Sequence, residues 1–515
     1  MTPGNVPWPL LGGVVLGVAA CALRLRRGRD ARGPWAVALG LGALFAATWL
    51  ARARMLPFAY FQQNGHGPRW IDYLLRPGSD NLLERKLMTS YGPGYYEVFS
   101  AVARLGTNPD RAVFLSQSLL GALAPPLAWL LARRSGARPL VAWSLAATVA
   151  LDPFLIRLAQ SESYIALCVA LLLGAAAVLA PSDPRVRVAS PGFVLSTLAA
   201  GLLVAQAVRT HPMCWFAAGM VPAVVLLGPG PLATRARLCG WSTLGVGATA
   251  GLVSGNIVYF VVSSPLANRL HTNPELDLRA WLLAWAGVAL ATGIALRRAP
   301  RRWRTAVLAP PVAALALFVL EITNVVDRPN AAFDGGRMHL CLPVLVAALA
   351  ACTAPLARRP WGAGALALLL GAAGAGAASA VWQLVSLMPT DALEASWALE
   401  WRARLPAGAR VLYLQDVGMT NSTLPLYPFE AHFAHSAGTP IPSLDELGSA
   451  PFYYRSSLCS RASGRQHCEE LESHFTLAPV AARDLPARAS MFRSGFDVPV
   501  VRVALYRVTG VASRR

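Results

Sequence analysis

The sequence predicts an α-helical polytopic membrane protein with about 12 transmembrane helices, followed by a small C-terminal mixed α/β extracytoplasmic domain. Three observations support this fold class. Hydrophobic residues make up 55% of the 515 residues and charged residues only 14%, whereas a soluble domain has roughly 25% charged residues. Apolar runs long enough to cross a bilayer recur along the chain. Basic residues are concentrated in alternate connections between these runs, as the positive-inside rule requires.

Apolar runs of about 17 to 25 residues can cross a hydrocarbon core about 30 Å thick, and the chain contains twelve of them. The first run follows an uncharged stretch and precedes several arginines, which is the reverse of the order in a cleaved signal peptide. The runs define a transmembrane domain, residues 1–386, and a C-terminal extracytoplasmic domain, residues 387–515. The runs are residues 8–25, 34–51, 112–132, 139–155, 163–180, 192–208, 212–227, 240–262, 280–296, 305–321, 339–357 and 361–386.

The basic residues orient the predicted helices. A net charge of +20 would suggest a nucleic-acid partner if it lay on one surface, but short alternate connections carry most of it. One set holds 19 Arg and 2 Asp, whereas the opposite set holds 6 Arg and 7 acidic residues. Because Lys and Arg accumulate on the cytoplasmic side, this predicts both termini outside, the lipid bilayer as a partner and no nucleic acid. The basic set is 24–33, 132–138, 181–191, 228–239, 297–304 and 357–360, and the opposite set is 152–162, 209–211, 263–279 and 321–338.

The long outer loop, residues 52–111, contains two predicted interfacial helices. Residues 68–78 and 79–88 each place leucines on one helical face and charged side chains on the other, which is the pattern of a helix lying flat on a membrane. Pro68 suits the start of the first helix and Pro77 its end. A turn rich in glycine and tyrosine, SYGPGYY, then leads toward the third span.

The C-terminal domain has the pattern of a small mixed α/β unit. An amphipathic helix near 392–404 precedes a strand within RLPAGARVLYLQD, and VPVVRVALYRV forms a last strand. Cys459 and Cys468 enclose a short polar stretch in a compartment that we expect to be oxidising, which predicts a local disulfide. Two free thiols are the alternative.

Three segments resemble a known family. The first is YGPGYYEVFSAVARLG followed by RAVFLSQSLLGALAPPLAWLLARRSG, the second is LDPFLIRLAQSESYIALCVALLLGAAAVLA, and the third is GGRMHLCLPVLVAALAA. Their order and sidedness are similar to those of GT-C membrane glycosyltransferases, specifically the family 39-like group that includes protein O-mannosyltransferases and the lipid A aminoarabinose transferase. The resemblance covers about residues 55–180 and 335–355.

The resemblance implies an inverting transfer of a sugar from a polyprenyl-phosphate donor to a lipid, glycan or protein acceptor. The reaction would take place at the outer face of a bacterial cytoplasmic membrane, with no metal or other cofactor. The chain departs from the family pattern in one place. The family carries an acidic residue directly after the span that opens the outer loop, and FAYFQQNGHG has none, so the identity of the catalytic base is open.

Sugar transfer of this kind needs a carboxylate that orients or accepts the acceptor proton. Asp72 lies on the polar face of the first interfacial helix, where an ion pair with the arginine four residues on is its alternative role. Glu162 precedes Tyr164, matches the family's acidic position and lies at the outer end of a span, where a charge is costly. Asp80 is the third candidate, with helix capping as its alternative. We interpret Asp152 first as a helix cap.

The departing lipid phosphate needs cations that stabilise its negative charge. Arg157, Arg209 and Arg337 each interrupt apolar sequence at a predicted outer end, and Lys86 is the single lysine of the chain. All four are candidate ligands of the donor phosphate. The alternative role of the arginines is to reach toward lipid headgroups.

Two other functions fit parts of the pattern. Twelve spans are common in transporters, but no repeated halves are visible and the outer loop and tail are large. A non-catalytic subunit in envelope assembly fits the missing carboxylate.

Overall fold

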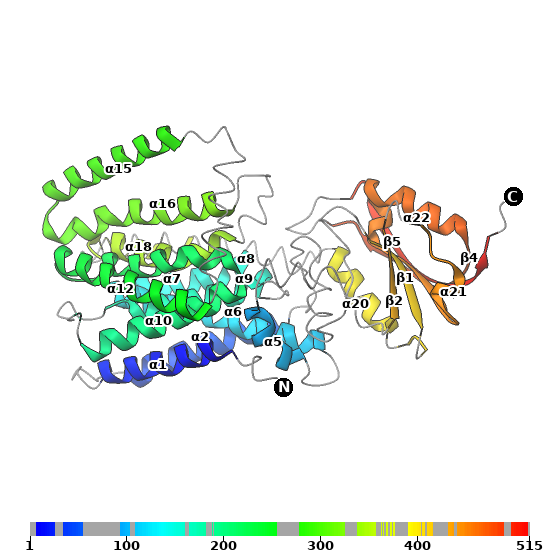
Figure 1. The fold of residues 1–515 in the computed structure, drawn as a ribbon, viewed down its shortest axis with the longest axis horizontal. Coiled ribbons are helices and arrows are strands. Elements are labelled where there is room, and N and C mark those ends of the chain that lie inside the picture. The colour runs from blue at the N-terminus through cyan, green and yellow to red at the C-terminus, as the bar shows by residue number, and fades with distance from the viewer. Residues whose placement is uncertain are drawn as a thin grey trace.

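The computed structural model of this chain contains a helical bundle and a five-stranded sheet (Figure 1). The two predicted interfacial helices, within residues 68–88, lie outside the described residues. The structure describes residues 7–25, 34–54, 93–103, 109–159, 164–181, 188, 190–254, 278–324, 337–356, isolated positions within 362–375, and residues 390–402, 404–406, 409–415, 431–436, 440–488 and 496–512.

The described part of the bundle consists of α-helices joined by short 3-10 turns. The helices before the middle of the chain are α1 (Trp8–Leu25), α2 (Pro34–Arg54), α5 (Gly94–Ala103), α6 (Pro109–Arg134), α7 (Pro139–Leu151), α8 (Pro153–Leu158), α9 (Tyr164–Leu179), α10 (Pro191–Thr210), η2 (Pro212–Phe216), α11 (Ala217–Ala223) and η3 (Val224–Leu227). They are followed by α12 (Leu232–Ser254), α15 (Leu278–Arg298), η4 (Arg301–Trp303), α16 (Arg304–Asn324), η5 (His339–Cys341) and α18 (Leu342–Thr353).

Several of these helices are suited to a membrane. Among the described residues, four segments are long and apolar enough to cross one, and five shorter apolar segments accompany them. They overlap the predicted runs, as expected for an integral membrane protein, whereas the count of about 12 spans stays a prediction. The four long segments are Ala36–Ala53, Ala112–Arg134, Pro191–Thr210 and Arg301–Leu320, and the shorter ones are Trp8–Ala20, Pro139–Leu151, Tyr164–Leu179, Pro212–Leu227 and His339–Thr353.

Helix α9 is the buried centre of the bundle. Nearly all of its side chains are buried, and it packs against α6 and α10. A helix that is apolar on every face is stable only when it is surrounded by other apolar groups. Helix α9 begins at Tyr164. This first residue lies at the end of the bundle where the polar residues described below gather.

The predicted cytoplasmic connection at 228–239 is shorter than expected, because α12 already begins at Leu232. Arg235, in the first turns of α12, is only 2% exposed, and its Nη1 donates a hydrogen bond to the carbonyl of Leu226 at the end of η3. Arg134 likewise donates to the carbonyl of Ala177 near the end of α9. Helix ends leave carbonyls without intrahelical partners, so these arginines cap helices.

The sheet has the strand order β2-β1-β3-β5-β4. Strands β2 (Ala431–Ser436), β1 (Arg410–Gln415) and β3 (Pro451–Arg455) are parallel. Strands β5 (Val500–Val511) and β4 (Phe475–Pro486) extend the sheet in antiparallel pairing. The predicted strands in RLPAGARVLYLQD and VPVVRVALYRV are therefore confirmed as β1 and β5, and the two occupy different positions within one mixed sheet.

Alternating side chains of the strands pack against helices on opposite faces. Val411 and Tyr454 share one core with Trp397 of α20 (Thr390–Arg402). Leu412 and Tyr453 share the other core with the short helix α21 (Leu444–Leu447) and with α22 (Ala462–His474). Because successive residues of a strand point to opposite faces, one run of apolar residues supplies both layers. The predicted amphipathic helix near 392–404 is confirmed as α20.

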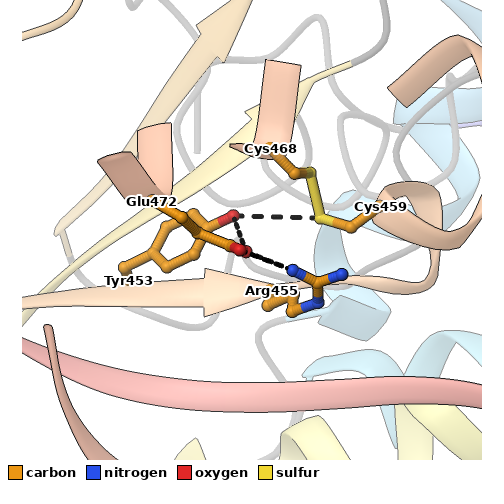
Figure 2. A network of polar contacts seen from close by, with 5 residues as sticks. All are labelled: Tyr453, Arg455, Cys459, Cys468 and Glu472. Atoms are coloured by element: carbon orange, nitrogen blue, oxygen red, sulfur yellow. Dashed lines mark hydrogen bonds and ion pairs between the residues drawn. A yellow bond between two sulfur atoms is a disulfide. The ribbon is translucent and has the colours of Figure 1, made fainter. Parts of the chain in front are cut away.

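Cys459 and Cys468 form a disulfide, as predicted, and this excludes the alternative of two free thiols. The bond joins η7 (Ser457–Ser460) to α22, and Figure 2 shows the polar network beside it. Glu472 accepts two hydrogen bonds from Nη1 of Arg455, at 2.5 and 2.6 Å, and one from the hydroxyl of Tyr453 at 3.2 Å. Burial and then the charge of Glu472 raise the pKa of Tyr453 well above its ordinary value. Tyr453 therefore donates as a neutral phenol.

Replacing Cys459 by serine should destabilise the sheet by about 2–3 kcal/mol, because the disulfide closes a short loop in the unfolded chain. Both sulfurs are buried, so a serine would also place a hydroxyl in an apolar core. Urea unfolding of the full-length protein in detergent, followed by the fluorescence of Trp397 and its neighbours in α20, measures the loss. Cys352→Ser is the matched control and should leave the midpoint unchanged, because its thiol lies in α18 and forms no disulfide.

Candidate functional site

Polar residues from distant parts of the chain gather at one end of the helical bundle. We call the set of Arg52, Glu97, Asp152, Arg209, His211, Arg337 and His339 the outer cluster, after the side on which the sequence predicts these residues. Helices α5 and α8, which belong to this end, lie at the end of the bundle that is nearer to the sheet (Figure 1).

Asp152 links the start of α8 to the late span that begins at η5. Its Oδ1 accepts a hydrogen bond from the backbone N–H of Leu155 at 2.8 Å, which confirms its predicted role as a helix cap. Its Oδ2 lies 3.0 Å from Nε2 of His339, 187 residues away in sequence. Burial opposes ionisation, but the hydrogen bond and charge of His339, together with backbone N–H groups, hold the pKa of Asp152 below its ordinary value. Asp152 is therefore ionised at neutral pH.

Two further contacts define the surroundings of this pair. The ring of His339 packs beside the ring of Phe154, with centroids 5.6 Å apart. Arg52, at the end of α2, is 2% exposed, donates to the carbonyl of Ala150 at 3.4 Å and lies within electrostatic reach of Asp152. A carboxylate that is largely removed from water is stable when it has both hydrogen bonds and a nearby cation, and the partly exposed Asp152 has both.

His211 occupies the turn between α10 and η2. Its Nδ1 accepts the backbone N–H of Met213 at 3.1 Å, and its ring stacks on Tyr164 with centroids 4.4 Å apart. Burial and then the charge of Arg337 lower the pKa of His211 well below its ordinary value. His211 is therefore a neutral imidazole whose proton, by this hydrogen-bond assignment, is on Nε2. Arg337 is therefore within electrostatic range of the end of α10.

Glu97 and Arg209 form an ion pair between α5 and α10. One carboxylate oxygen accepts from Nη2 of Arg209, and the other lies 3.3 Å from Nε. Beside them, Nε2 of Gln206 donates to the carbonyl of Gly94 at 3.2 Å. A Cβ atom on Gly94 would lie 2.5 Å from the backbone nitrogen of Thr210, so glycine allows the two helices to approach this closely.

The structure describes two of the predicted phosphate ligands: Arg209, two residues before His211 in the chain, and Arg337, whose charge acts on His211. Arg157 lies on α8, although its side chain is outside the described residues. Four other predicted site residues, Asp72, Asp80, Lys86 and Glu162, also lie outside the described residues. The roles assigned to all seven stay predictions.

The partners that hold the outer cluster together were not predicted from the sequence. Glu97 is an isolated carboxylate within the otherwise apolar and aromatic run GYYEVFSAVA, and a charge in such a run is a usable signal of a buried ion pair. His339 and His211 gave no such signal, because nothing local shows that each meets a residue from another span. No group of three or more metal-ligating side chains occurs within the described residues.

Chemically, the outer cluster combines cations, a neutral imidazole and engaged carboxylates at the end of a membrane bundle. Arginine guanidinium groups bind phosphate through planar, charge-assisted hydrogen bonds. Within the described residues, Glu97 and Asp152 both have strong partners, so the fixed charges here suit the binding of an anion better than the abstraction of a proton.

The apolar helices of the bundle are those of an integral membrane protein, and a mixed five-stranded sheet accompanies them. The chain matches no protein-family model, and no curated protein matches it. Solved structures do match. ArnT from Cupriavidus metallidurans bound to undecaprenyl phosphate is 13% identical, with a TM-score of 0.51 over 92% of this chain and 98% of the ArnT chain. The apo state of the same protein is 15% identical, with a TM-score of 0.51 over 91% and 98%.

ArnT is the lipid A aminoarabinose transferase, a membrane glycosyltransferase with the GT-C fold, and the likeness to it shows that this chain has that fold. The predicted GT-C fold is thus confirmed. The oligosaccharyltransferase of Archaeoglobus fulgidus, in complex with Zn and sulfate, is 12% identical with a TM-score of 0.43 over 85% of this chain and 72% of its own.

Proposed function

We propose that this chain is an inverting glycosyltransferase of the GT-C type. It moves a sugar from a polyprenyl-phosphate donor to a lipid, glycan or protein acceptor of the cell envelope. The reaction takes place at the outer face of a bacterial cytoplasmic membrane, with both termini outside. One observation carries the proposal, which is the likeness to ArnT over 92% of this chain and 98% of ArnT. ArnT binds undecaprenyl phosphate in that structure, and a lipid of this class is the donor scaffold that we propose here.

The outer cluster supports this choice of substrate. Arg209 lies two residues before the neutral His211, and the charge of Arg337 acts on the same imidazole. A polyprenyl tail would lie along the lipid-facing helices while its phosphate reaches this end of the bundle. Cations at such a place stabilise the charge that develops on the phosphate as it leaves. Arg157 and Lys86 are the further phosphate ligands that the sequence predicts.

In the proposed reaction, an acceptor oxygen attacks the anomeric carbon of the sugar. The bond from that carbon to the phosphate oxygen breaks, and the polyprenyl phosphate leaves with the bonding electrons. A carboxylate accepts the acceptor proton. Attack from the side opposite the phosphate inverts the anomeric centre. Asp72 and Glu162 are the leading candidates for this base, and Asp80 is the third.

A transfer assay tests the proposal. The full-length protein is reconstituted in vesicles with a radiolabelled sugar on undecaprenyl phosphate and with extracted envelope lipids and glycans as acceptors. Transfer of label, release of undecaprenyl phosphate and inversion of the anomeric configuration are the expected results. Heat-denatured protein is the control. The proposal fails if the donor remains intact with every acceptor.

The two alternative functions give different results in the same vesicles. A transporter would move labelled solute across the membrane without consuming the donor. A non-catalytic assembly subunit would do neither but would co-purify with a transferase activity that is lost when the partner is removed. The folded five-stranded sheet of the predicted outer tail favours the enzyme over the transporter, because a transporter built of repeated halves does not need a domain there.

A further inference from the structure

Glu97 is a buried carboxylate whose strong partner is one arginine. Its side chain is 3% exposed, in the first turn of α5, while the side chain of Arg209 is 19% exposed at the end of α10. Both oxygens of Glu97 are engaged, one by Nη2 and the other by Nε of Arg209. The pair therefore occupies one edge of the guanidinium plane and leaves the edge that carries Nη1.

Within the part of the chain that the structure describes, Nη1 of Arg209 donates no hydrogen bond, whereas Nε and Nη2 donate to Glu97. A guanidinium group is planar and presents its donors in fixed directions. When Glu97 holds the Nε edge, the direction of the remaining N–H groups is fixed as well. The partly exposed guanidinium group of Arg209 thus presents one edge to Glu97 and another edge that a ligand can reach.

Contacts other than this ion pair also hold α5 against α10. Gln206, one turn before Arg209, donates to the carbonyl of Gly94 at 3.2 Å, and the hydroxyl of Thr210 donates to the carbonyl of Gln206 at 2.9 Å. The close approach of Gly94 to Thr210 also joins α5 to α10. Helix packing is therefore secured by contacts other than the ion pair, which leaves orientation of the guanidinium as the specific contribution of Glu97.

We propose that Glu97 is a positioning residue that orients Arg209, so that the remaining N–H edge of the guanidinium binds the phosphate of the polyprenyl-phosphate donor. This inference rests on the proposed function. The effect on phosphate affinity that we expect from removing Glu97 is opposite to the effect expected from charge alone. Removing a carboxylate makes the site more positive and should tighten phosphate binding if charge alone mattered. Loss of orientation weakens binding instead, because the long side chain must then be ordered by the ligand itself.

Titration of undecaprenyl phosphate onto the full-length protein in nanodiscs tests this. Lipid affinity and the unfolding midpoint are both measured for wild type, Glu97→Asp, Glu97→Gln, Arg209→Gln and the double variant Glu97→Gln/Arg209→Gln. We expect about tenfold weaker binding for Glu97→Gln and Arg209→Gln, and about threefold weaker binding for Glu97→Asp. The double variant should bind no more weakly than Arg209→Gln, because Glu97 acts only through the arginine.

Two choices keep the test decisive. Glu97→Asp retains the charge and so keeps a partner for Arg209, which gives a folded variant even if Glu97→Gln is destabilised by the loss of that partner. Glu472→Gln is the matched control, since it breaks the comparable pair with Arg455 in the sheet and should leave lipid affinity unchanged.

The outcomes separate the inference from the proposed function. If wild type binds the lipid and transfers sugar, while Glu97→Asp and Glu97→Gln bind it equally well or more tightly, Glu97 serves only packing and the inference is overturned. The proposed function then stands. If wild type does not bind undecaprenyl phosphate, both are overturned. The inference is supported if the Glu97 variants bind the lipid more weakly than wild type and if Glu97→Gln causes no further loss of affinity in the Arg209→Gln background.

Discussion

Replacing Arg337 by glutamine is expected to lower the rate of sugar transfer by about 100-fold, the typical effect of removing one preorganised donor of charge stabilisation. Arg337 comes just before η5, and its charge acts on His211 at the end of α10. A cation that lies where two spans meet is well placed to hold a phosphate that leaves at that end of the bundle. The rate should fall without unfolding, because the side chain is partly exposed.

Initial rates of transfer from undecaprenyl-phosphate sugar measure this effect. Arg337→Lys keeps the charge but loses the planar fork, so we expect a smaller loss of about tenfold. Arg302→Gln is the matched control, because Arg302 is exposed in η4 on the predicted cytoplasmic side, and its rate should equal that of wild type. An unchanged rate in Arg337→Gln would instead assign Arg337 to contact with lipid headgroups.

Conversion of the catalytic carboxylate to its amide should lower the rate by about 10² to 10⁴, the usual contribution of a general base. Asp72→Asn and Glu162→Gln are the two variants of interest. The contacts of the other carboxylates in the structure favour these two residues as the base. Glu97 is ion-paired with Arg209, and Asp152 is bound to His339 and to the backbone of Leu155. Both carboxylates of the outer cluster are thus already engaged, and the base is expected among the predicted residues of the outer connections.

Transfer rate and donor affinity together identify the base. A true base variant loses transfer but still binds undecaprenyl phosphate, since the phosphate ligands are intact. Glu470→Gln is the control, because Glu470 is an exposed carboxylate on α22 whose side chain is 59% exposed, and it should behave as wild type. Full activity in both Asp72→Asn and Glu162→Gln would exclude them and turn attention to Asp80.

Features that depend on local composition were predictable from the sequence. The helices α2, α6 and α10 coincide with apolar runs, because only a continuous apolar helix is stable in hydrocarbon. The disulfide between Cys459 and Cys468 followed from two thiols close together in a segment that we expected to lie in an oxidising compartment. Strands β1 and β5 followed from β-branched and aromatic residues in short runs. In each case the residues that interact, or the property that matters, lie within one short segment.

The start of α12 and the capping role of Arg235 were not predicted. A basic stretch was interpreted as a connection because charge is usually found there, yet Arg235 is buried and bonded to the end of η3. A charged side chain can be buried when it is long enough to donate a hydrogen bond to a neighbouring carbonyl. Composition alone does not reveal whether such a carbonyl is within reach.

By itself the sequence determined that this is a polytopic membrane protein, predicted which connections share a side, and predicted that Arg209 and Arg337 are cations at outer ends. Only the tertiary structure decided that Arg209 is held by Glu97, 112 residues away, and that Asp152 meets His339 across 187 residues. The physical reason is the range of the interactions. Hydrophobicity and sidedness act on each segment separately, whereas hydrogen bonds and ion pairs depend on how whole helices pack, which no single segment encodes.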